Sequence, residues 1–313
     1  MKIALILDPL DELKFHKDTS IAIMREAARR GHVLFVLGQG DLLLRNDKAV
    51  VHAQPFSFCD GEPGYAVGEK SEIVPQMFDV LLMRKDPPFD MEYVTSTWLL
   101  ELAERQGARV FNRPQAIRDF NEKISVARFP QFAPPFLVTR QMAAIREFLV
   151  EHGDIVVKPL DGMGGSGIFR LHSDDHNIGV ILETITHFER RTVMAQRYLP
   201  AIKQGDKRIL LIDGEPVPYA LARIPKAGET RGNLAAGGTG VAQPLSKRDR
   251  EIAATVGAEL KKLGLFLVGL DVIGNHLTEI NVTSPTCMVE IAAQTDCDPA
   301  ALFVDALERT CGG

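Results

Sequence analysis

The sequence has no apolar stretch of about 18 residues, the length that a membrane-spanning helix requires. Its N-terminal apolar run, Ile3 to Leu7, ends at Asp8 and is too short for a secretory signal. It also has no block of like charge, and 36 basic against 41 acidic residues give a formal net charge of −5. That balance argues against a nucleic-acid or anionic-membrane partner. We therefore expect a cytoplasmic protein that binds neither.

Cysteine is scarce, with four residues in 313, and no two of them form a CxxC pair. No histidine stands at metal-ligand spacing from them, which argues against a zinc site and favours four reduced thiols. What remains is an ordinary globular composition, 45% hydrophobic and 25% charged. The length corresponds to about two domains.

The first 120 or so residues alternate between strand and helix patterns. Strand patterns cover 2–8, 32–37, 78–83 and 108–111, and helix patterns begin near Asp18 and Met91. This order predicts a parallel sheet flanked by helices, an α/β arrangement. The turn after the first strand contains no glycine, so we expect no dinucleotide there.

The second half changes to strand pairs and predicts an antiparallel, α+β arrangement. A helix pattern at 247–262 ends before Gly264, and Asp213-Gly214 is a strong hairpin signal. The expected strands are 155–160, 168–171, 208–212, 216–222, 265–273 and 277–282. Residues 225–240 are rich in glycine and have no periodicity, and long loops of this kind are usually lids or binding loops.

A glycine-rich segment follows Lys158. Gly162, Gly164 and Gly167 match GxGxxG, but a strand pattern follows where a dinucleotide site requires a helix. A strand, a glycine loop and a returning strand can instead form a flap whose amides close on polyphosphate, with Lys158 supplying positive charge. An ordinary glycine-rich hairpin with a solvated lysine explains this segment equally well.

A candidate metal site lies near the end of the chain. Glu279 and Asn281 are two residues apart on a predicted strand, so they share one face. A three-residue hairpin loop, 274–276, would place Asp271 opposite Glu279, whereas a two-residue loop would put Asp271 among apolar neighbours. The amphipathic pattern favours the three-residue loop. Two carboxylates and an amide suit Mg²⁺ bound together with phosphate oxygens, and the alternative is an exposed acidic face.

These features together predict an ATP site without a Walker motif, a protein-kinase motif set or a nucleophile elbow. Lys123 is a candidate second phosphate lysine, although a lone lysine in a helix is usually solvated. The segments that carry chemistry are MRKDPPFD (83–90), NEK (121–123), KPLDGMGG (158–165), RGNLAAGG (231–238) and TEINVTSPT (278–286). In these motifs and their order, the chain resembles ATP-grasp enzymes, and among them the bacterial glutathione synthetases.

The resemblance implies an ATP-grasp fold with three parts: an N-terminal parallel α/β domain at 1–122, a central lid subdomain at 123–200, and a C-terminal antiparallel subdomain at 201–313. It also implies ATP-dependent ligation of γ-glutamylcysteine and glycine, and a homotetramer. The implied nucleotide contacts are Lys123, Lys158, Gly162, Gly164, Gly165, Gln196, Tyr198, Leu199 and Asp206. Asp271, Glu279 and Asn281 would hold Mg²⁺, with Mn²⁺ as a second candidate, and two ions would bind with ATP.

Arginines are the candidates for gripping the substrate carboxylates, because a planar guanidinium binds a carboxylate through two hydrogen bonds. We expect Arg208, and Arg231 with Asn233, in this role, and Arg84 with less support; a surface ion pair is the alternative for each arginine. Thr283, Ser284 and Thr286 either bind glycine or cap the turn at Pro285.

Two other functions stay open at this stage. One is another ATP-grasp carboxylate-amine ligase, either similar to D-alanine-D-alanine ligase or glutamate-adding. The other is a non-catalytic ATP-binding regulator.

Overall fold

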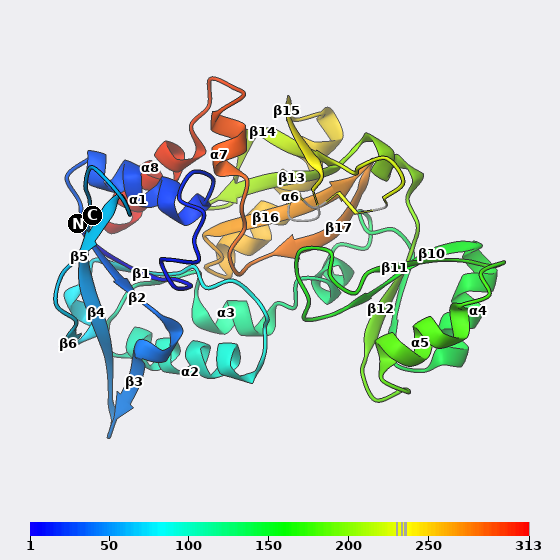
Figure 1. The fold of residues 1–313 in the computed structure, drawn as a ribbon, viewed down its shortest axis with the longest axis horizontal. Coiled ribbons are helices and arrows are strands. Elements are labelled where there is room, and N and C mark those ends of the chain that lie inside the picture. Colours follow the sequence, from blue (N-terminus) through cyan, green and yellow to red (C-terminus); the bar gives the residue numbers. More distant parts are fainter. Residues whose placement is uncertain (230, 233, 235–236, 313) are drawn as a thin grey trace.

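The structure is a computed structural model that describes residues 1–229, 231, 232, 234 and 237–312. It contains three sheets arranged along the long axis of the molecule, with both chain ends at one extremity (Figure 1). Among the described residues, no helix combines the length and the apolar character that crossing a bilayer requires.

The N-terminal sheet has the strand order β3-β4-β2-β1-β7-β8, with β5 and β6 also paired to β4. Its strands are β1 (Lys2–Ile6), β2 (Val33–Leu37), β3 (Leu42–Arg45), β4 (Lys48–Phe58), β5 (Tyr65–Val67), β6 (Ser71–Ile73), β7 (Val80–Met83) and β8 (Val110–Phe111). The predicted parallel sheet is confirmed for β1, β2, β7 and β8. The prediction is incomplete, because β3 to β6 add an antiparallel ribbon.

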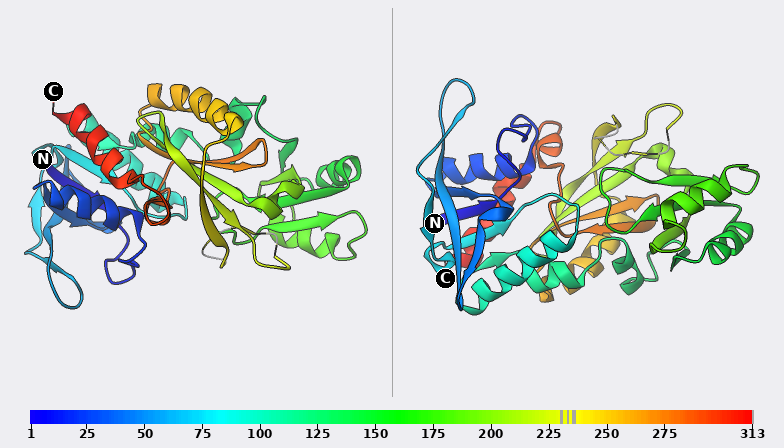
Figure 2. Two further views of the ribbon diagram at one scale, coloured as in Figure 1. Left: turned by 90° about the horizontal axis from the view of Figure 1, so that it is seen from above. Right: turned by 60° about the horizontal axis from the view of Figure 1, so that its bottom comes forward.

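Helices cover both faces of this sheet. Successive side chains of β1 point to opposite faces, so the strand contributes to the core on each side. Ile3 and Leu5 pack in a core with α1 (Thr19–Arg29), α7 (Met288–Ala292) and α8 (Pro299–Cys311). Ala4 and Ile6 face the opposite core, with α2 (Met91–Arg105) and α3 (Pro114–Asp119). The last helix of the chain therefore packs against the first (Figure 2).

The contact between α1 and α8 includes a cluster of charged side chains. The Arg30 guanidinium donates to Glu26 at 2.7 Å, to Asp305 at 2.6 Å and to Glu308 at 2.8 Å. Glu26 also accepts two hydrogen bonds from Arg29, each 2.7 Å long. The hydrogen bonds from Arg29 and then Arg30 outweigh burial and lower the pKa of Glu26 from 4.5 to about 2.

We expect Glu26→Gln to lower the free energy of unfolding by about 1 kcal/mol at neutral pH, because the exposed Arg29 is screened by solvent. In the unfolded chain Glu26 protonates near its ordinary pKa, whereas in the folded chain it stays ionised down to about 2. Its contribution is therefore complete above about pH 5 and is lost as the pH falls toward 2. Urea denaturation of both proteins at neutral and acidic pH measures this. A difference that grows on acidification contradicts the prediction.

The central sheet has the order β11-β10-β12-β9 and is antiparallel throughout. Its elements are β9 (Phe136–Thr139), α4 (Met142–His152), β10 (Asp154–Pro159), β11 (Phe169–His172), α5 (Ile178–Thr186) and β12 (Val193–Arg197). Apolar side chains of α4 and α5, such as Ile145 and Leu182, form a separate core with the strands. This part stands apart on the right of Figure 1.

The third sheet has the order β15-β14-β13-β16-β17. Its elements are β13 (Asp206–Ile212), β14 (Glu215–Ile224), β15 (Thr239–Pro244), α6 (Lys247–Lys262), β16 (Leu267–Ile273) and β17 (His276–Asn281). The hairpin at Asp213-Gly214 and the helix before Gly264 are confirmed. The division of the chain at residues 122 and 200 stays a prediction.

Candidate active site

A cavity of about 330 Å³ lies between the central sheet, the third sheet and the loops that follow the N-terminal strands. Almost every site residue predicted from the sequence lines it: Lys123, Lys158, Gly162, Gly164, Gly165, Gln196, Tyr198, Leu199, Asp206, Arg208, Arg231, Asp271, Glu279 and Asn281. Asn233 lies outside the described residues. The structure therefore gathers the predicted residues around one cavity, while the role of each stays a prediction.

The β16–β17 hairpin places Asp271 directly opposite Glu279, as predicted, but by a different route. The loop has two residues, Gly274 and Asn275, because Ile273 pairs with His276. The three-residue loop was wrong. The register shifts next to Asp271, so Thr278 is an extra residue in β17, and this bulge returns both carboxylates to one face.

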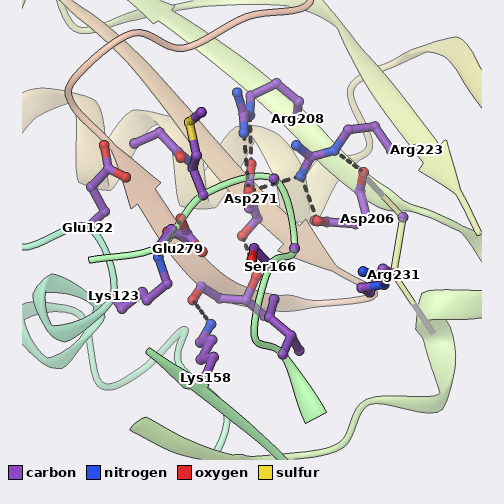
Figure 3. A pocket seen from close by; sticks show the side chains of 18 of the residues that line it. Glu122, Lys123, Lys158, Ser166, Asp206, Arg208, Arg223, Arg231, Asp271 and Glu279 are labelled. Atoms are coloured by element: carbon purple, nitrogen blue, oxygen red, sulfur yellow. Dashed lines mark hydrogen bonds and ion pairs between the residues drawn. The ribbon is translucent and has the colours of Figure 1, made fainter. Parts of the chain in front are cut away.

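Two arginines hold Asp271, as Figure 3 shows. Arg208 Nε lies 2.6 Å from Asp271 Oδ1, and Arg223 Nη2 lies 2.9 Å from Asp271 Oδ2. Burial opposes the charge on Asp271, but Arg208 and Arg223 outweigh it and hold its pKa well below the usual range. Asp271 is thus ionised, and the Arg208 guanidinium is paired with it in the cavity wall.

Arg223 is a site residue that sequence reasoning missed. It pairs with Asp206 across β13 and β14, and its Nη2 donates to Asp206 Oδ2 at 2.5 Å. The predicted strand ended at Ala222, one residue before Arg223, whereas β14 continues to Ile224. Strand alternation also did not reveal the pairing of Arg223 with Asp206, because the register of this hairpin shifts between Ile209 and Leu211.

Both predicted phosphate lysines are buried in the cavity wall. Lys158, on β10, donates to Thr278 O at 3.2 Å, and burial lowers its pKa. Lys123 precedes a short 3-10 turn rather than standing within a helix, and it is 3% exposed. Its Nζ lies 3.3 Å from Glu279 Oε1. Burial disfavours its charge, but the attraction of Glu279 and Glu122 raises its pKa. Because Lys123 is buried, the solvated alternative is excluded for it.

The glycine loop lies between antiparallel strands β10 and β11, which confirms the strand–loop–strand arrangement. Gly164 and Gly165 have φ values of +63° and +81°, in the left-handed region that favours glycine. At Gly162 an added Cβ would lie 3.0 Å from the Pro159 ring. The loop backbone can therefore adopt a conformation that side chains would obstruct. Such a conformation lets backbone amides come close to a phosphate group.

Two buried polar atoms at the cavity have no hydrogen-bond partner among the described residues: Gln196 Nε2 and Asp206 Oδ1. One is a donor and the other an acceptor, and leaving such atoms unpaired costs free energy. Burial raises the pKa of Asp206 to about 6, although Arg223 opposes this. Unpaired atoms of both kinds suit a polar ligand such as a nucleotide.

The acidic residues of the site fit a divalent cation. No three His, Cys, Asp or Glu side chains in the described part of the chain gather closely enough to hold a metal by themselves. The predicted set has only two carboxylates, Asp271 and Glu279, with the Asn281 amide. Mg²⁺ commonly takes few protein ligands and completes its shell with phosphate oxygens and water. The donor set therefore fits a metal that arrives with a nucleotide.

Arg84 does not reach the cavity. It is 6% exposed, and its guanidinium donates to Ser20 Oγ and to Pro285 O, each at 3.0 Å. The expected position at the end of a sheet strand is correct, but the chain around Pro285 covers it. In this structure Arg84 joins the N-terminal sheet to that chain segment rather than lining the cavity.

Arg231 lines the cavity from the segment between β14 and β15. Its side chain is 36% exposed, and its Nη2 lies 3.2 Å from Glu229 Oε2. No strongly buried partner fixes it among the described residues. Such an arginine can reorient toward a bound anion.

Comparison with known proteins agrees with this geometry. Residues 1–118 match the N-terminal domain of prokaryotic glutathione synthetase, and residues 122–296 match its ATP-grasp domain. The chain is 62% identical to the glutathione synthetase of Nitrosomonas europaea, over 99% of this chain and 98% of that protein.

Solved structures share the fold at low sequence identity. D-cycloserine synthetase DcsG superposes with a TM-score of 0.69 at 15% identity, over 99% of this chain and all of the other. The ATP-grasp ligase PsnB, solved with a minimal precursor, Mg and ADP, gives 0.63 at 17%, over 99% of this chain and 98% of the other. These likenesses establish the ATP-grasp fold. With both domain matches and the full-length identity, the chain belongs to the prokaryotic glutathione synthetase family.

Proposed function

We propose that this site joins γ-glutamylcysteine to glycine at the expense of ATP and releases glutathione, ADP and phosphate. The observation that supports this most strongly is that one cavity is lined by two buried lysines, a glycine loop, two opposed carboxylates and several arginines. Membership of the family supports the same reaction.

A carboxylate is a poor acyl donor, so it must first be activated. Its oxygen attacks the γ-phosphorus of ATP, and the bond between that phosphorus and the β-γ bridging oxygen breaks. The products of this step are an acyl phosphate and ADP. The glycine amine then attacks the acyl carbon, loses a proton and displaces phosphate. The protein contributes positioning and charge rather than a nucleophile.

Each part of the cavity has a role in this proposal. Lys123 and Lys158 neutralise charge on the phosphates while the backbone of the glycine loop closes over them. The 196–199 backbone lies against adenine, and Asp206 contacts the nucleotide. Arg208 and Arg231, with Asn233, bind substrate carboxylates, and the 225–240 loop excludes water from the acyl phosphate.

ATP-grasp ligases work with divalent metal ions. We propose that Asp271, Glu279 and Asn281 hold Mg²⁺, or Mn²⁺ in its place, and that two ions bind with ATP. The metal would neutralise the phosphoryl oxygens during transfer. Glu279 has only Lys123 as an ionic partner among the described residues, which leaves it available to a cation.

We further propose a homotetramer acting in the cytoplasm, as the resemblance to bacterial relatives implies. All four cysteines are free, which is compatible with a reducing compartment. Light scattering of the purified chain measures the mass of the assembly.

The reaction is tested by phosphate and glutathione release from Mg-ATP with γ-glutamylcysteine and glycine. We expect both products in equal amounts, and neither when one substrate is withheld. A parallel mixture with D-alanine separates the other ligase class. Turnover only with D-alanine, or ATP binding without turnover in any mixture, contradicts the proposal.

A further inference from the structure

The segment that follows β17 is held by side chains from the first 122 residues. Pairing of β17 with β16 ends at Asn281, opposite Gly269. Residues 283–287, which come next, line the cavity without belonging to a strand. We call residues 282–287 the wall segment. Because the wall segment is not hydrogen-bonded to a neighbouring strand, other contacts must fix its position.

Glu122 supplies three of these contacts through one oxygen. Its Oε1 accepts hydrogen bonds from Val282 N at 3.0 Å, Thr283 N at 3.2 Å and Thr283 Oγ1 at 2.9 Å. One carboxylate oxygen thus replaces the missing strand partner for two consecutive amides.

Other side chains complete this attachment. Asn112 Nδ2 donates to Val282 O at 2.7 Å, so both main-chain groups of Val282 are held. Ser284 donates to Asp86, and Arg84 Nη2 donates to Pro285 O at 3.0 Å. All these partners lie before residue 123, more than 150 residues from the wall segment. The N-terminal part therefore contributes to the cavity by fixing one of its walls.

The neighbours of Glu122 hold the opposite side of the cavity. Asn121 Nδ2 donates to Leu160 O at 3.1 Å, and Lys123 Nζ donates to Gly162 O at 2.9 Å. Three consecutive residues thus join the base of the glycine flap to the wall segment. Glu122 is the member that contacts the wall.

We propose that Glu122 is a positioning residue that sets the wall segment in place to receive the amine substrate, glycine. The inference rests on the proposed function. The flap side of the cavity is the part that we assign to phosphate, whereas the wall segment lines the cavity next to Asn281, where we expect the amine to approach the activated carboxyl. Glu122 acts through Val282 and Thr283 rather than by touching the reacting atoms.

Glu122→Ala removes all three acceptor contacts but keeps the main-chain hydrogen bond from Ile280 N to Glu122 O, 2.9 Å long, so β17 remains attached. We expect the KM for glycine to rise about tenfold or more, while the KM for ATP changes by less than about twofold. Glu122→Gln keeps an acceptor oxygen in the same place, and we expect it to restore most of the affinity for glycine.

Two further variants sharpen the test. Thr283→Val removes only the hydroxyl donor and should raise the KM for glycine by a smaller factor. Glu101→Gln is the matched control, because Glu101 on α2 pairs with Arg105 of the same helix and Arg118 of α3, and none of the three lines the cavity. It should behave as the wild type.

Three results overturn the inference: an unchanged KM for glycine in Glu122→Ala, an equal rise in the KM for every substrate, or equal loss in the Ala and Gln variants. The last would mean that the charge of Glu122 acts directly. If the wild-type chain forms no glutathione, the proposed function itself fails, which is a separate observation.

Discussion

Glu279→Gln is expected to lower turnover at limiting Mg²⁺ by about a hundredfold or more, while the chain stays folded. The substitution keeps the shape of the side chain and removes its charge. Glu279 lies opposite Asp271 on the polar face of the β16–β17 hairpin. Because Asp271 is already paired with Arg208 and Arg223, Glu279 is the carboxylate with most capacity to bind a cation.

The measurement is the rate of phosphate release as a function of Mg²⁺ concentration. A lost ligand shifts the midpoint to higher Mg²⁺, whereas a general defect lowers the rate at every concentration. Glu215→Gln is the matched control, because Glu215 is an exposed glutamate on β14 of the same sheet. If Glu279→Gln keeps the wild-type rate at limiting Mg²⁺, the assignment of this ligand is wrong.

The β16–β17 hairpin shows how a sequence pattern can give a correct pairing through an incorrect turn. Alternation placed Glu279 and Asn281 on one face, and the apolar residues around Asp271 required that it face the same way. Those constraints determine which residues meet. They do not distinguish a three-residue loop from a two-residue loop followed by a bulge at Thr278, because both shift the register by one residue.

The contacts that the sequence did not reveal around the wall segment join distant parts of the chain. Glu122 bonds to Thr283 across 161 positions, and Arg84 bonds to Pro285 across 201. No local periodicity encodes such partners. The antiparallel ribbon was missed for another reason: β5 and β6 have three residues each and are largely exposed, so they carry little hydrophobic pattern. Local patterns thus revealed the motifs but not the attachments that hold them.

Arg231→Ala is expected to lower kcat by about a hundredfold while leaving the affinity for ATP within a few-fold of the wild type. Arg231 reaches the cavity from the segment between β14 and β15 and has a half-exposed ion pair with Glu229, so it is available to a substrate anion or the acyl phosphate. A group that stabilises charge mainly in the transition state affects kcat rather than binding. ATP binding measured by calorimetry, beside steady-state kinetics, separates the two effects.

The ratio of phosphate released to glutathione formed gives a second, independent readout. If the loop excludes water from the acyl phosphate, then a loop that no longer closes lets water compete with glycine, and this ratio should rise above one in Arg231→Ala. Arg105→Ala is the control, because Arg105 is an exposed arginine with a single glutamate partner on α2. An unchanged kcat in Arg231→Ala rules out a catalytic role for this arginine. A lowered kcat with the ratio still at one would instead assign Arg231 to charge stabilisation, without a part in excluding water.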